Sequence, residues 1–521
     1  MAAVLARPLP KILPRVRLSL RRTLGSILLL AGGVAAAVAA DPTAATADDV
    51  IGNSVVKLYG TTREPDFANP WKRLTASDIS GSGLVIEGHR ILTNAHMVLY
   101  TTNLEVQGSQ GGDRFPAHVV AVAPGIDLAV LAVDDDAFFA TRPPLKRGGA
   151  LPHIKDPVFV YGYPAGGDSL SITKGIVSRI EFVGYGGMTG GLRIQIDAAI
   201  NHGNSGGPAL VGDTVIGLAF SFLGGAQNIG YIIPNEEIDL MLAQVAKGPF
   251  EGRLTSGDLF QSAENPTLRR YLKLPAAVHG AMVVAPDPLV PHDPLQRWDV
   301  VTQVGDAAVD DQGMVQPRED LHVSMDYLFN REARGGLVPL TVYRDGALMR
   351  VELPVRPGVS LLFPDLAGTY PSYFIYGPLV FSKAYFQNEQ FVGSPALSHY
   401  LAERGSPLVA RINDNPAFAG EELVMMPSTF FSSPLTKGYS DPQLRVVKSL
   451  NGVPVRNLLH LVGLLRDSRD PYVIIEFADP HTEKLVFRRS DLASSTETIL
   501  ANNGVRSRGS PDTLAEWNRK P

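Results

Sequence analysis

The chain of 521 residues contains no cysteine. This absence excludes disulfide bonds, thiolate zinc sites and a cysteine nucleophile, and it suits an exported protein that avoids thiol oxidation. Cofactor motifs are missing as well: there is no Walker-type phosphate loop, no GxGxxG between a strand and a helix, and no HExxH zinc motif. We therefore expect neither a cofactor nor a bound metal.

Long runs of one charge sign are also lacking, although 19% of the residues are charged and 45% are apolar. Without a basic stripe or an acidic tail, nucleic acid is not an expected partner. The composition is that of a globular protein. Because domains usually hold roughly 100 to 200 residues, a chain of this length predicts about three of them.

Acidic side chains are absent from residues 1–40, which carry six basic ones and the apolar run Leu24 to Val38. That run is shorter than the ~20 residues a membrane span needs, and it ends in small residues suited to signal peptidase. We expect a signal peptide cleaved near Ala40 and export to the periplasm. Cleavage would lower the formal net charge from −5 to about −11. An uncleaved membrane anchor and a chloroplast or mitochondrial transit peptide are the alternatives.

Short strand-like runs recur between glycine or proline breaks from about residue 50 to 235, without helices between them. This pattern is typical of antiparallel barrels or sandwiches. The region ends with an amphipathic helix in PNEEIDLMLAQVA (234–246), which places Ile238, Met241, Leu242 and Val245 on one face, and Asn235 is its expected N-cap. The runs are VVKLYG, SGLVIE, HVVAVA, LAVLAVD, PVFVYGYP, SITKGIVSRI, LRIQIDA, VIGLAFSF and IGYIIP.

An internal repeat follows Gly248. VVTQVGDAAV (300–309) and VVKSLNGVPV (446–455) each predict a strand, a turn and a short strand, followed by a helix and a hairpin. The Asp345-Gly346 turn is a strong hairpin signal. Two related α/β modules are therefore expected. The predicted segments are a targeting segment (1–40), a protease-like β domain (41–247), a first module (248–358), a second module with an insertion (359–491) and a polar, frayed tail (492–521).

Three short stretches carry chemistry. His96 follows a strand in ILTNAHMV, Asp127 begins a strand in GIDLAVLAV, and Ser205 lies in GNSGGP. A serine hydroxyl becomes a nucleophile only when a nearby imidazole takes its proton and an acid orients that ring. These residues are thus candidates for a catalytic triad, although each one alone is also a common turn, cap or loop residue.

The glycines around Ser205 fit the same chemistry. Backbone N–H groups must converge on the oxygen that becomes negative during acyl transfer, and the chain must turn sharply there. The Gly203 and Ser205 N–H groups are the expected oxyanion hole. Gly206 and Gly207 would let the following strand pack closely, and Pro208 would stiffen it.

These motifs resemble the trypsin-like serine proteases, and among them the HtrA/Deg family. GSGLVI, ILTNAH, DLAVL, DAAINHGNSGGP, GLAFSF and IGYIIP occur in family order, and ENPTLRRYLKL with the long second module is most similar to the two-PDZ Deg proteases of plants and their bacterial relatives. The resemblance implies a double β-barrel followed by two PDZ domains. It also implies that His96 is the general base, Asp127 its orienting acid and Ser205 the nucleophile.

The substrate pocket of this fold is built from residues just before the nucleophile and from a nearby strand. Ala199, Ile200 and Phe220 are the candidates, beside their simpler interpretation as core residues. No acidic residue stands there, so a small or medium apolar residue before the cut is expected.

PDZ domains bind an extended peptide as an added edge strand and hold its terminal carboxylate in a loop of backbone N–H groups. The loop in EGRLTSG, with Gly252, Arg253 and Leu254, is the candidate in the first module. YGPLVFS (376–382) is its counterpart in the second module. Peptide binding is less expected for the second module, which carries a long insertion.

The resemblance implies an exported, ATP-independent serine endopeptidase that cuts unfolded or damaged polypeptides in protein quality control. Its PDZ modules would recruit substrate or control a homo-oligomer built on trimers. Membrane anchoring is expected only if the N-terminal segment stays uncleaved. The rival hypotheses are a holdase chaperone or peptide-binding scaffold with weak proteolysis, and a processing protease with one native target.

Overall fold

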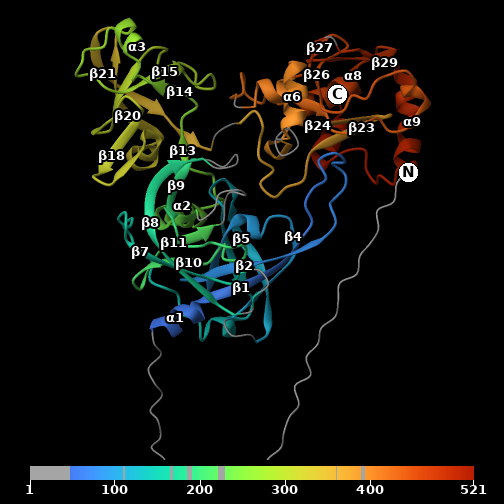
Figure 1. The fold of residues 1–521 in the computed structure, drawn as a ribbon. Coiled ribbons are helices and arrows are strands. Elements are labelled where there is room, and N and C mark those ends of the chain that lie inside the picture. The colour runs from blue at the N-terminus through green and yellow to red at the C-terminus, as the bar shows by residue number, and fades with distance from the viewer. Residues whose placement is uncertain are drawn as a thin grey trace, which may run out of the picture. The chain divides into compact units, whose positions relative to one another are not determined.

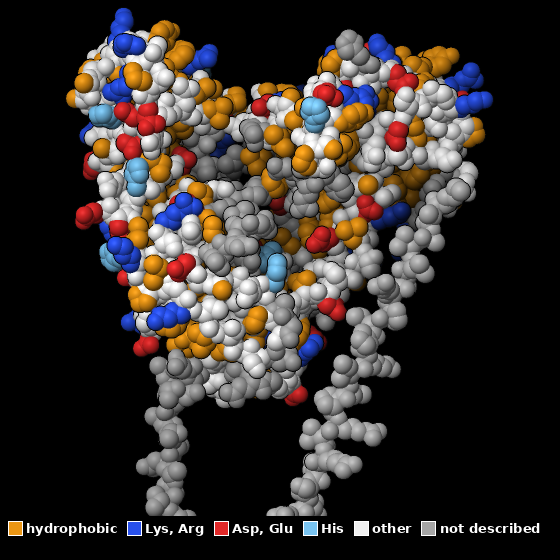
Figure 2. Space-filling view, in the orientation of Figure 1, with side chains coloured by type: hydrophobic (Ala, Val, Ile, Leu, Met, Phe, Trp, Pro, Cys, Tyr) orange, Lys and Arg blue, Asp and Glu red, His pale blue; other side chains and the backbone are white. Residues whose placement is uncertain are grey.

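The computed structural model describes residues 47–108, 112–164, 167, 169–184, 190–220, 229–358, 361–388, 394–412, 414–480 and 482–520. The predicted targeting segment 1–40 lies outside these residues, as do Ser221 and Phe222 of the GLAFSF motif. Among the described helices, none has the length and apolar character needed to cross a bilayer. Figure 2 shows Lys and Arg side chains interspersed with Asp and Glu side chains on the face in view.

Six antiparallel strands close the first barrel in the order β1-β2-β3-β6-β5-β4 (Figure 1). Val56, Leu58 and Val85 belong to its core and are at most 1% exposed. At Gly83 a Cβ atom would lie 2.7 Å from the Ile91 side chain, so only glycine lets β2 pass this close to β3. After helix α1 (Ala47–Ser54), the strands are β1 (Val55–Thr62), β2 (Ser77–Ile86), β3 (Arg90–Thr93), β4 (Thr101–Gln107), β5 (Arg114–Ala123) and β6 (Leu128–Val133).

A second closed barrel has the order β10-β11-β12-β9-β8-β7, which confirms the predicted double barrel. Helix α2 (Asn235–Val245) follows it and buries Ile238 and Met241, as expected. The predicted N-cap is wrong. Asn235 is buried, and its side-chain amide donates to the carbonyls of Gly148 and Val215 at 2.8 and 2.6 Å. The strands are β7 (Pro157–Gly162), β8 (Ser171–Val183), β9 (Gly191–Ile196), β10 (Pro208–Val211), β11 (Thr214–Phe220) and β12 (Gly230–Pro234).

The first module contains a sheet in the order β14-β15-β16-β20-β21. The Asp345-Gly346 turn joins β20 to β21 with Arg344 paired to Ala347, which confirms the predicted hairpin. Asn265 caps helix α3: its side-chain oxygen accepts the N–H groups of Thr267 and Leu268. The elements are β13 (Leu254–Thr255), β14 (Leu259–Ser262), α3 (Pro266–Tyr271), β15 (Ala281–Ala285), β16 (Val300–Val304), β17 (Ala307–Ala308), β18 (Met314–Arg318), β19 (Leu321–Ser324), α4 (Phe329–Glu332), β20 (Leu337–Arg344), β21 (Ala347–Pro354) and β22 (Arg356–Pro357).

The second module repeats this plan, with its sheet in the order β23-β24-β25-β26-β28-β29. The β26-β27 pair repeats the β16-β17 pair, which confirms the internal repeat. One difference concerns the strand edge. β24 pairs along its length with β23, whereas its counterpart β14 ends its sheet. The elements are β23 (Tyr373–Tyr376), β24 (Leu379–Lys383), α6 (Pro395–Glu403), α7 (Pro407–Ala410), β25 (Val424–Met426), β26 (Arg445–Leu450), β27 (Val453–Pro454), α8 (Leu458–Asp467), β28 (Tyr472–Phe477) and β29 (Leu485–Arg488).

The C-terminal residues form two helices, α9 (Arg489–Asn502) and α10 (Pro511–Trp517), where the sequence predicts a frayed tail. That prediction is wrong because few but well-placed apolar side chains anchor the segment: Trp517 packs on Phe374 and Tyr376 with ring centroids 5.1 and 5.8 Å apart. The backbone also pairs with β23, since the Ile375 N–H donates to the Arg508 carbonyl at 2.7 Å.

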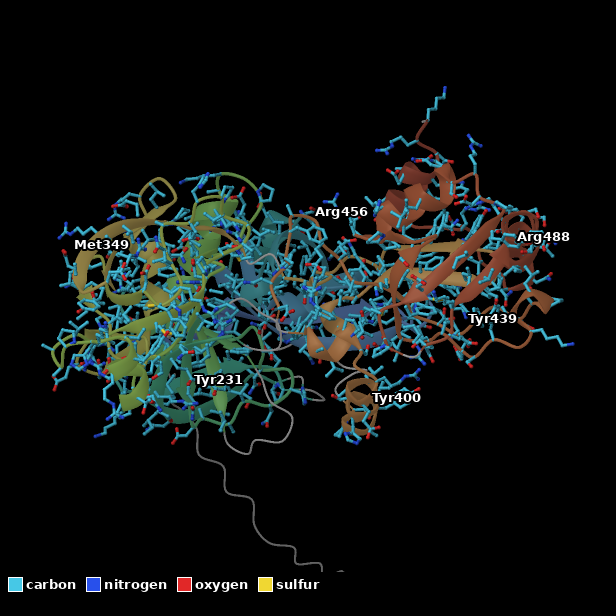
Figure 3. All side chains as sticks on the ribbon, turned by 90° about the horizontal axis from the view of Figure 1, so that it is seen from above. Tyr231, Met349, Tyr400, Tyr439, Arg456 and Arg488 are labelled. Carbon is cyan, nitrogen blue, oxygen red and sulfur yellow. The ribbon has the colours of Figure 1, made fainter. Side chains whose placement is uncertain are left out.

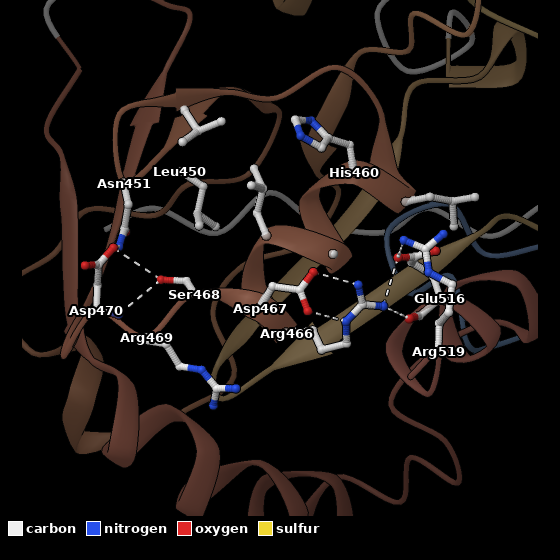
Figure 4. Close-up of a pocket in the computed structure, with 14 residues that line it drawn as sticks. Leu450, Asn451, His460, Arg466, Asp467, Ser468, Arg469, Asp470, Glu516 and Arg519 are labelled. Atoms are coloured by element: carbon white, nitrogen blue, oxygen red, sulfur yellow. Dashed lines mark hydrogen bonds and ion pairs between the residues drawn. The ribbon is translucent and has the colours of Figure 1, made fainter. Parts of the chain in front are cut away.

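Charged groups add to the contact between α8 and α10 (Figure 4). The Arg466 guanidinium bonds to the carboxylates of Asp467 and Glu516, at 2.6 and 2.9 Å. Arg519 bonds to Glu516 as well, at 3.3 Å. These residues line a cavity of about 670 Å³ beside the two helices. The α9 and α10 helices are thus an integral part of the second module.

Candidate active site

The first barrel brings His96 and Asp127 together. His96 lies in a 3₁₀ turn (Ala95–Met97) directly after β3, and Asp127 ends another 3₁₀ turn directly before β6. β3 and β6 are neighbouring antiparallel strands, with Thr93 opposite Ala129. The end of one strand therefore lies beside the start of the other.

Asp127 holds His96 through two contacts to its imidazole and one to its backbone. Its carboxylate oxygens lie 2.8 and 3.1 Å from Nδ1, and its Oδ1 accepts the His96 backbone N–H at 2.9 Å. Asp127 is 3% exposed and has a left-handed φ of +60°, a conformation rare outside glycine. The Asn94 amide donates to the Asp127 carbonyl at 3.1 Å. The carboxylate is thus fixed on Nδ1 of His96, and the other ring nitrogen, Nε2, is left for proton transfer.

Two opposing effects act on the His96 imidazole. Burial lowers the pKa of His96, but the charge of Asp127 and its hydrogen bond outweigh burial and raise that pKa above the ordinary 6.5. A raised pKa makes the imidazole a stronger base. This is the property that deprotonation of a serine hydroxyl requires.

The loop that carries Ser205 needs glycine at three positions. Gly203 and Gly206 have φ angles of +98° and +85°, which disfavour any side chain. A Cβ atom at Gly206 would lie 2.0 Å from the Ser82 carbonyl oxygen, and one at Gly207 would lie 1.9 Å from the Tyr161 carbonyl oxygen. The glycines therefore allow the close backbone approach that the sequence predicts around this serine.

Ser82 of β2 joins this loop to the strand before His96. The Ser82 N–H donates to the Ser205 carbonyl at 2.9 Å, and the Thr93 hydroxyl donates to the Ser82 carbonyl at 2.8 Å. Sequence reasoning assigned no role to Ser82 beyond its place in the GSGLVI motif. The available signal was a serine between two glycines, Gly81 and Gly83, in an apolar strand.

The three candidate pocket residues differ in exposure. Ala199 is exposed and Ile200 is half-buried. Phe220 is 1% exposed and contacts the ring of Tyr231, a β12 residue labelled in Figure 3, with ring centroids 6.0 Å apart. The buried guanidinium of Arg193 lies 5.3 Å from the Phe220 ring. Phe220 therefore contacts the protein interior, and Ala199 contacts solvent.

The candidate peptide loop of the first module is tied to its surroundings. The Gly252 N–H donates to the Gln244 side chain at 3.3 Å, and the Leu254 N–H donates to the Asn330 side chain at 3.0 Å. The buried side chain of Arg253 forms an ion pair with Glu237. Across the described part of the chain, no group of three His, Cys, Asp or Glu side chains is placed to hold a metal ion.

Comparisons with known proteins match two regions of the chain to known domains. A trypsin-like peptidase domain model matches residues 81–218, and a PDZ domain model matches residues 364–512. Protease Do-like 2, chloroplastic, of Arabidopsis thaliana is 34% identical over 473 residues, which cover 89% of this chain and 76% of the relative. Protease Do-like 4, mitochondrial, of the same plant is 34% identical over 431 residues, which cover 82% and 79%.

Among solved structures, the HtrA-type protease AlgW with decapeptide is 22% identical, with a TM-score of 0.47, and the match covers 60% of this chain and 99% of that one. The two plant relatives, each matched over more than three quarters of its length, and the peptidase match together identify the family. The chain is a serine endopeptidase of the HtrA/Deg family of trypsin-like proteases.

Proposed function

We propose that the chain degrades unfolded or damaged polypeptides in protein quality control, without ATP, with Ser205 as its nucleophile. The observation that carries this proposal is the hydrogen-bonded pair of His96 and Asp127. Strand β3, which precedes His96, is bonded through Thr93 to Ser82, and the Ser82 N–H donates to the Ser205 carbonyl. The family relationship supports the quality-control role.

In the proposed mechanism, the Ser205 hydroxyl attacks the carbonyl carbon of the peptide bond while His96 Nε2 takes its proton. Asp127 keeps Nδ1 protonated and stabilises the imidazolium that forms. The Gly203 and Ser205 N–H groups bind the oxyanion, each contributing about 10²- to 10³-fold in rate. His96 then protonates the leaving amine, and it activates the water that hydrolyses the acyl-enzyme.

Ala199, Ile200 and Phe220 remain the proposed pocket residues. An apolar pocket of this kind favours a small or medium apolar side chain before the cut, since none of these three residues offers a negative charge to a buried lysine or arginine. Sequencing the products of casein digestion tests this preference. Cuts made mainly after basic residues would contradict it.

We propose that the first module is also a PDZ domain and that it recruits the substrate. Its strand β14 ends the sheet, and among the described strands none pairs with its outer edge. An extended peptide can add there as a further strand. The Gly252–Leu254 loop is not proposed as its carboxylate site, because the Gly252 and Leu254 N–H groups already donate to Gln244 and Asn330. Leu259 on β14 is 50% exposed, so Leu259→Asp should slow casein degradation and leave labelling by a fluorophosphonate unchanged. Equal rates for the two proteins would refute recruitment at this edge.

For assembly, we propose a homo-oligomer built on trimers, as the family relationship suggests, and sedimentation velocity tests it.

For the compartment, residues 1–40 would direct either export to the periplasm or import into an organelle. The chloroplastic and mitochondrial names of the plant relatives support import. N-terminal sequencing of the protein from its native source would show whether cleavage occurs near Ala40.

The test of the proposed activity uses unfolded casein without ATP, with a stably folded protein as the control substrate. The wild-type chain should degrade casein and spare the control, and Ser205→Ala should degrade neither. Equal degradation by the two chains would refute the nucleophile assignment. Suppressed aggregation by Ser205→Ala would reveal an additional holdase role, and cleavage restricted to one native protein would favour a processing protease.

A further inference from the structure

Every polar atom of Ser82 is hydrogen-bonded, and two of its bonds go to the loop that carries the nucleophile. Ser82 is completely buried in β2. Its hydroxyl donates to the Gly203 carbonyl at 2.7 Å and accepts the Tyr163 N–H at 2.8 Å. Its own N–H donates to the Ser205 carbonyl, and its carbonyl accepts the Thr93 hydroxyl. Strand β2 is thus hydrogen-bonded to the loop at the carbonyls of Gly203 and Ser205, which flank Asn204.

The peptide group between Gly203 and Asn204 connects the two proposed oxyanion donors. Its carbonyl is held by the Ser82 hydroxyl, and its N–H donates to the Asn201 carbonyl at 3.0 Å. The peptide group after Ser205 is fixed as well, because the Gly206 N–H donates to the Ala219 carbonyl at 2.9 Å. The direction of the donors therefore depends on these bonds.

The backbone freedom of Gly203 is the reason that its carbonyl needs the hydrogen bond from the Ser82 hydroxyl. Gly203 has a φ of +98° and no Cβ atom, so sterics restrict rotation of its peptide group less than at any other residue type. Among the described residues, none accepts a hydrogen bond from the Gly203 N–H, so this donor is available to a substrate oxygen. A fixed direction of such donors is what gives an oxyanion hole its effect.

We propose that the Ser82 hydroxyl is a positioning group for the oxyanion hole: it holds the Gly203–Asn204 peptide group so that the Gly203 and Ser205 N–H groups converge. The proposal rests on the assignment of these two donors made above. Ser82 acts through the loop and does not touch the substrate.

Ser82→Ala is the direct test, with Ser54→Ala as its matched control. Ser54 in α1 is also completely buried, and its hydroxyl donates to backbone carbonyls away from the nucleophile loop. Ser82→Ala should lower kcat on a fluorogenic casein about 10²- to 10³-fold, the loss typical of a removed oxyanion donor, with little change in KM. Ser54→Ala should keep kcat within about twofold of wild type while losing a comparable amount of thermal stability.

A peptidyl boronate separates positioning from general destabilisation. Its tetrahedral adduct on the nucleophile uses the oxyanion hole, so its affinity should fall in Ser82→Ala by about the same factor as kcat/KM. Boronate affinity equal to that of Ser54→Ala would overturn the proposal. If wild-type protein failed to react with a fluorophosphonate, the proposed function itself would fall, whereas reactive wild type with unaffected Ser82→Ala kinetics would refute only the positioning role.

Ser82→Cys keeps the test decisive if Ser82→Ala does not fold. A thiol is a weaker and longer hydrogen-bond donor than a hydroxyl, so kcat should fall about tenfold and boronate affinity should fall in step. A side chain larger than cysteine is unsuitable, because Gly162 packs close to this position: a Cβ atom there would lie 3.0 Å from the Ser82 hydroxyl oxygen. Wild-type kcat in a folded Ser82→Cys protein would contradict the proposal.

Discussion

The ion pair between Arg253 and Glu237 provides a sharp test of the physical reasoning. Their side chains are 3% and 0% exposed, and one guanidinium nitrogen donates to both carboxylate oxygens, at 2.8 and 2.9 Å. Glu237 also accepts the Leu192 N–H at 2.7 Å, so helix α2 is bonded to β9 through the same carboxylate. Arg253→Met would leave that carboxylate buried and unpaired.

A buried charge that loses its partner destabilises a protein by about 3–5 kcal/mol. For domains of this size, that loss corresponds to a melting temperature lower by roughly 6–20 °C. The double variant Arg253→Met with Glu237→Gln should recover much of the loss, because the glutamine oxygen can still accept the Leu192 N–H and carries no charge.

Differential scanning calorimetry on the Ser205→Ala background measures these effects without self-digestion. Lys484→Met is the matched control, since Lys484 is 65% exposed in its ion pair with Glu476 and should cost less than about 1 kcal/mol. An Arg253→Met protein that melts within about 2 °C of its parent would refute the buried-charge reasoning. A double variant no more stable than Arg253→Met would refute it as well.

Three further predictions follow from other parts of the chain. Asp127→Asn should lower kcat about 10⁴-fold. It should also move the acidic limb of the kcat/KM profile to lower pH, because the charge that raises the pKa of His96 is lost. A pH-rate profile on casein in which this limb does not move would contradict the prediction. Burial and the Asp293 carboxylate raise the pKa of Asp258 from 3.8 to about 6, so this group makes the fold less stable as pH rises from about 4 to 6. Asp258→Asn should therefore add about 1–3 kcal/mol at pH 8 and nothing at pH 4 in guanidinium unfolding, and an equal gain at both pH values would be inconsistent with it. Trp517→Ala should cost about 1–3 kcal/mol and speed hydrogen exchange across 508–517, and unchanged exchange there would show that α10 is not held by this ring.

The sequence predicts the double barrel well because its strands are marked by apolar runs with glycine or proline at their ends. β4 is the informative exception. Its residues Thr101 to Gln107 are largely polar, and the strand exists because it pairs with both β1 and β5. β5 is the next strand, but β1 lies far earlier in the chain, and its pairing with β4 leaves no apolar run in residues 101–107 that would predict the strand.

Distant contacts also explain what was missed elsewhere. Asn235 has the right residue type for a helix cap, but two carbonyls from other segments take its amide. Trp517 is an isolated aromatic residue in a polar segment, and only the surface formed by Phe374 and Tyr376 gives it a place to pack. Ser82 has no local signature beyond its glycine neighbours, since all its partners lie elsewhere in the chain.

The proposed triad residues carry the opposite lesson, because His96, Asp127 and Ser205 each lie in a short motif whose neighbours serve the same chemistry. Their roles are tested most directly by labelling with a fluorophosphonate, followed by mass spectrometry of the labelled peptide. The wild-type protein should carry the label on Ser205 alone, and His96→Ala should lose it. A label on another residue, or one that persists in His96→Ala, would contradict an activated Ser205.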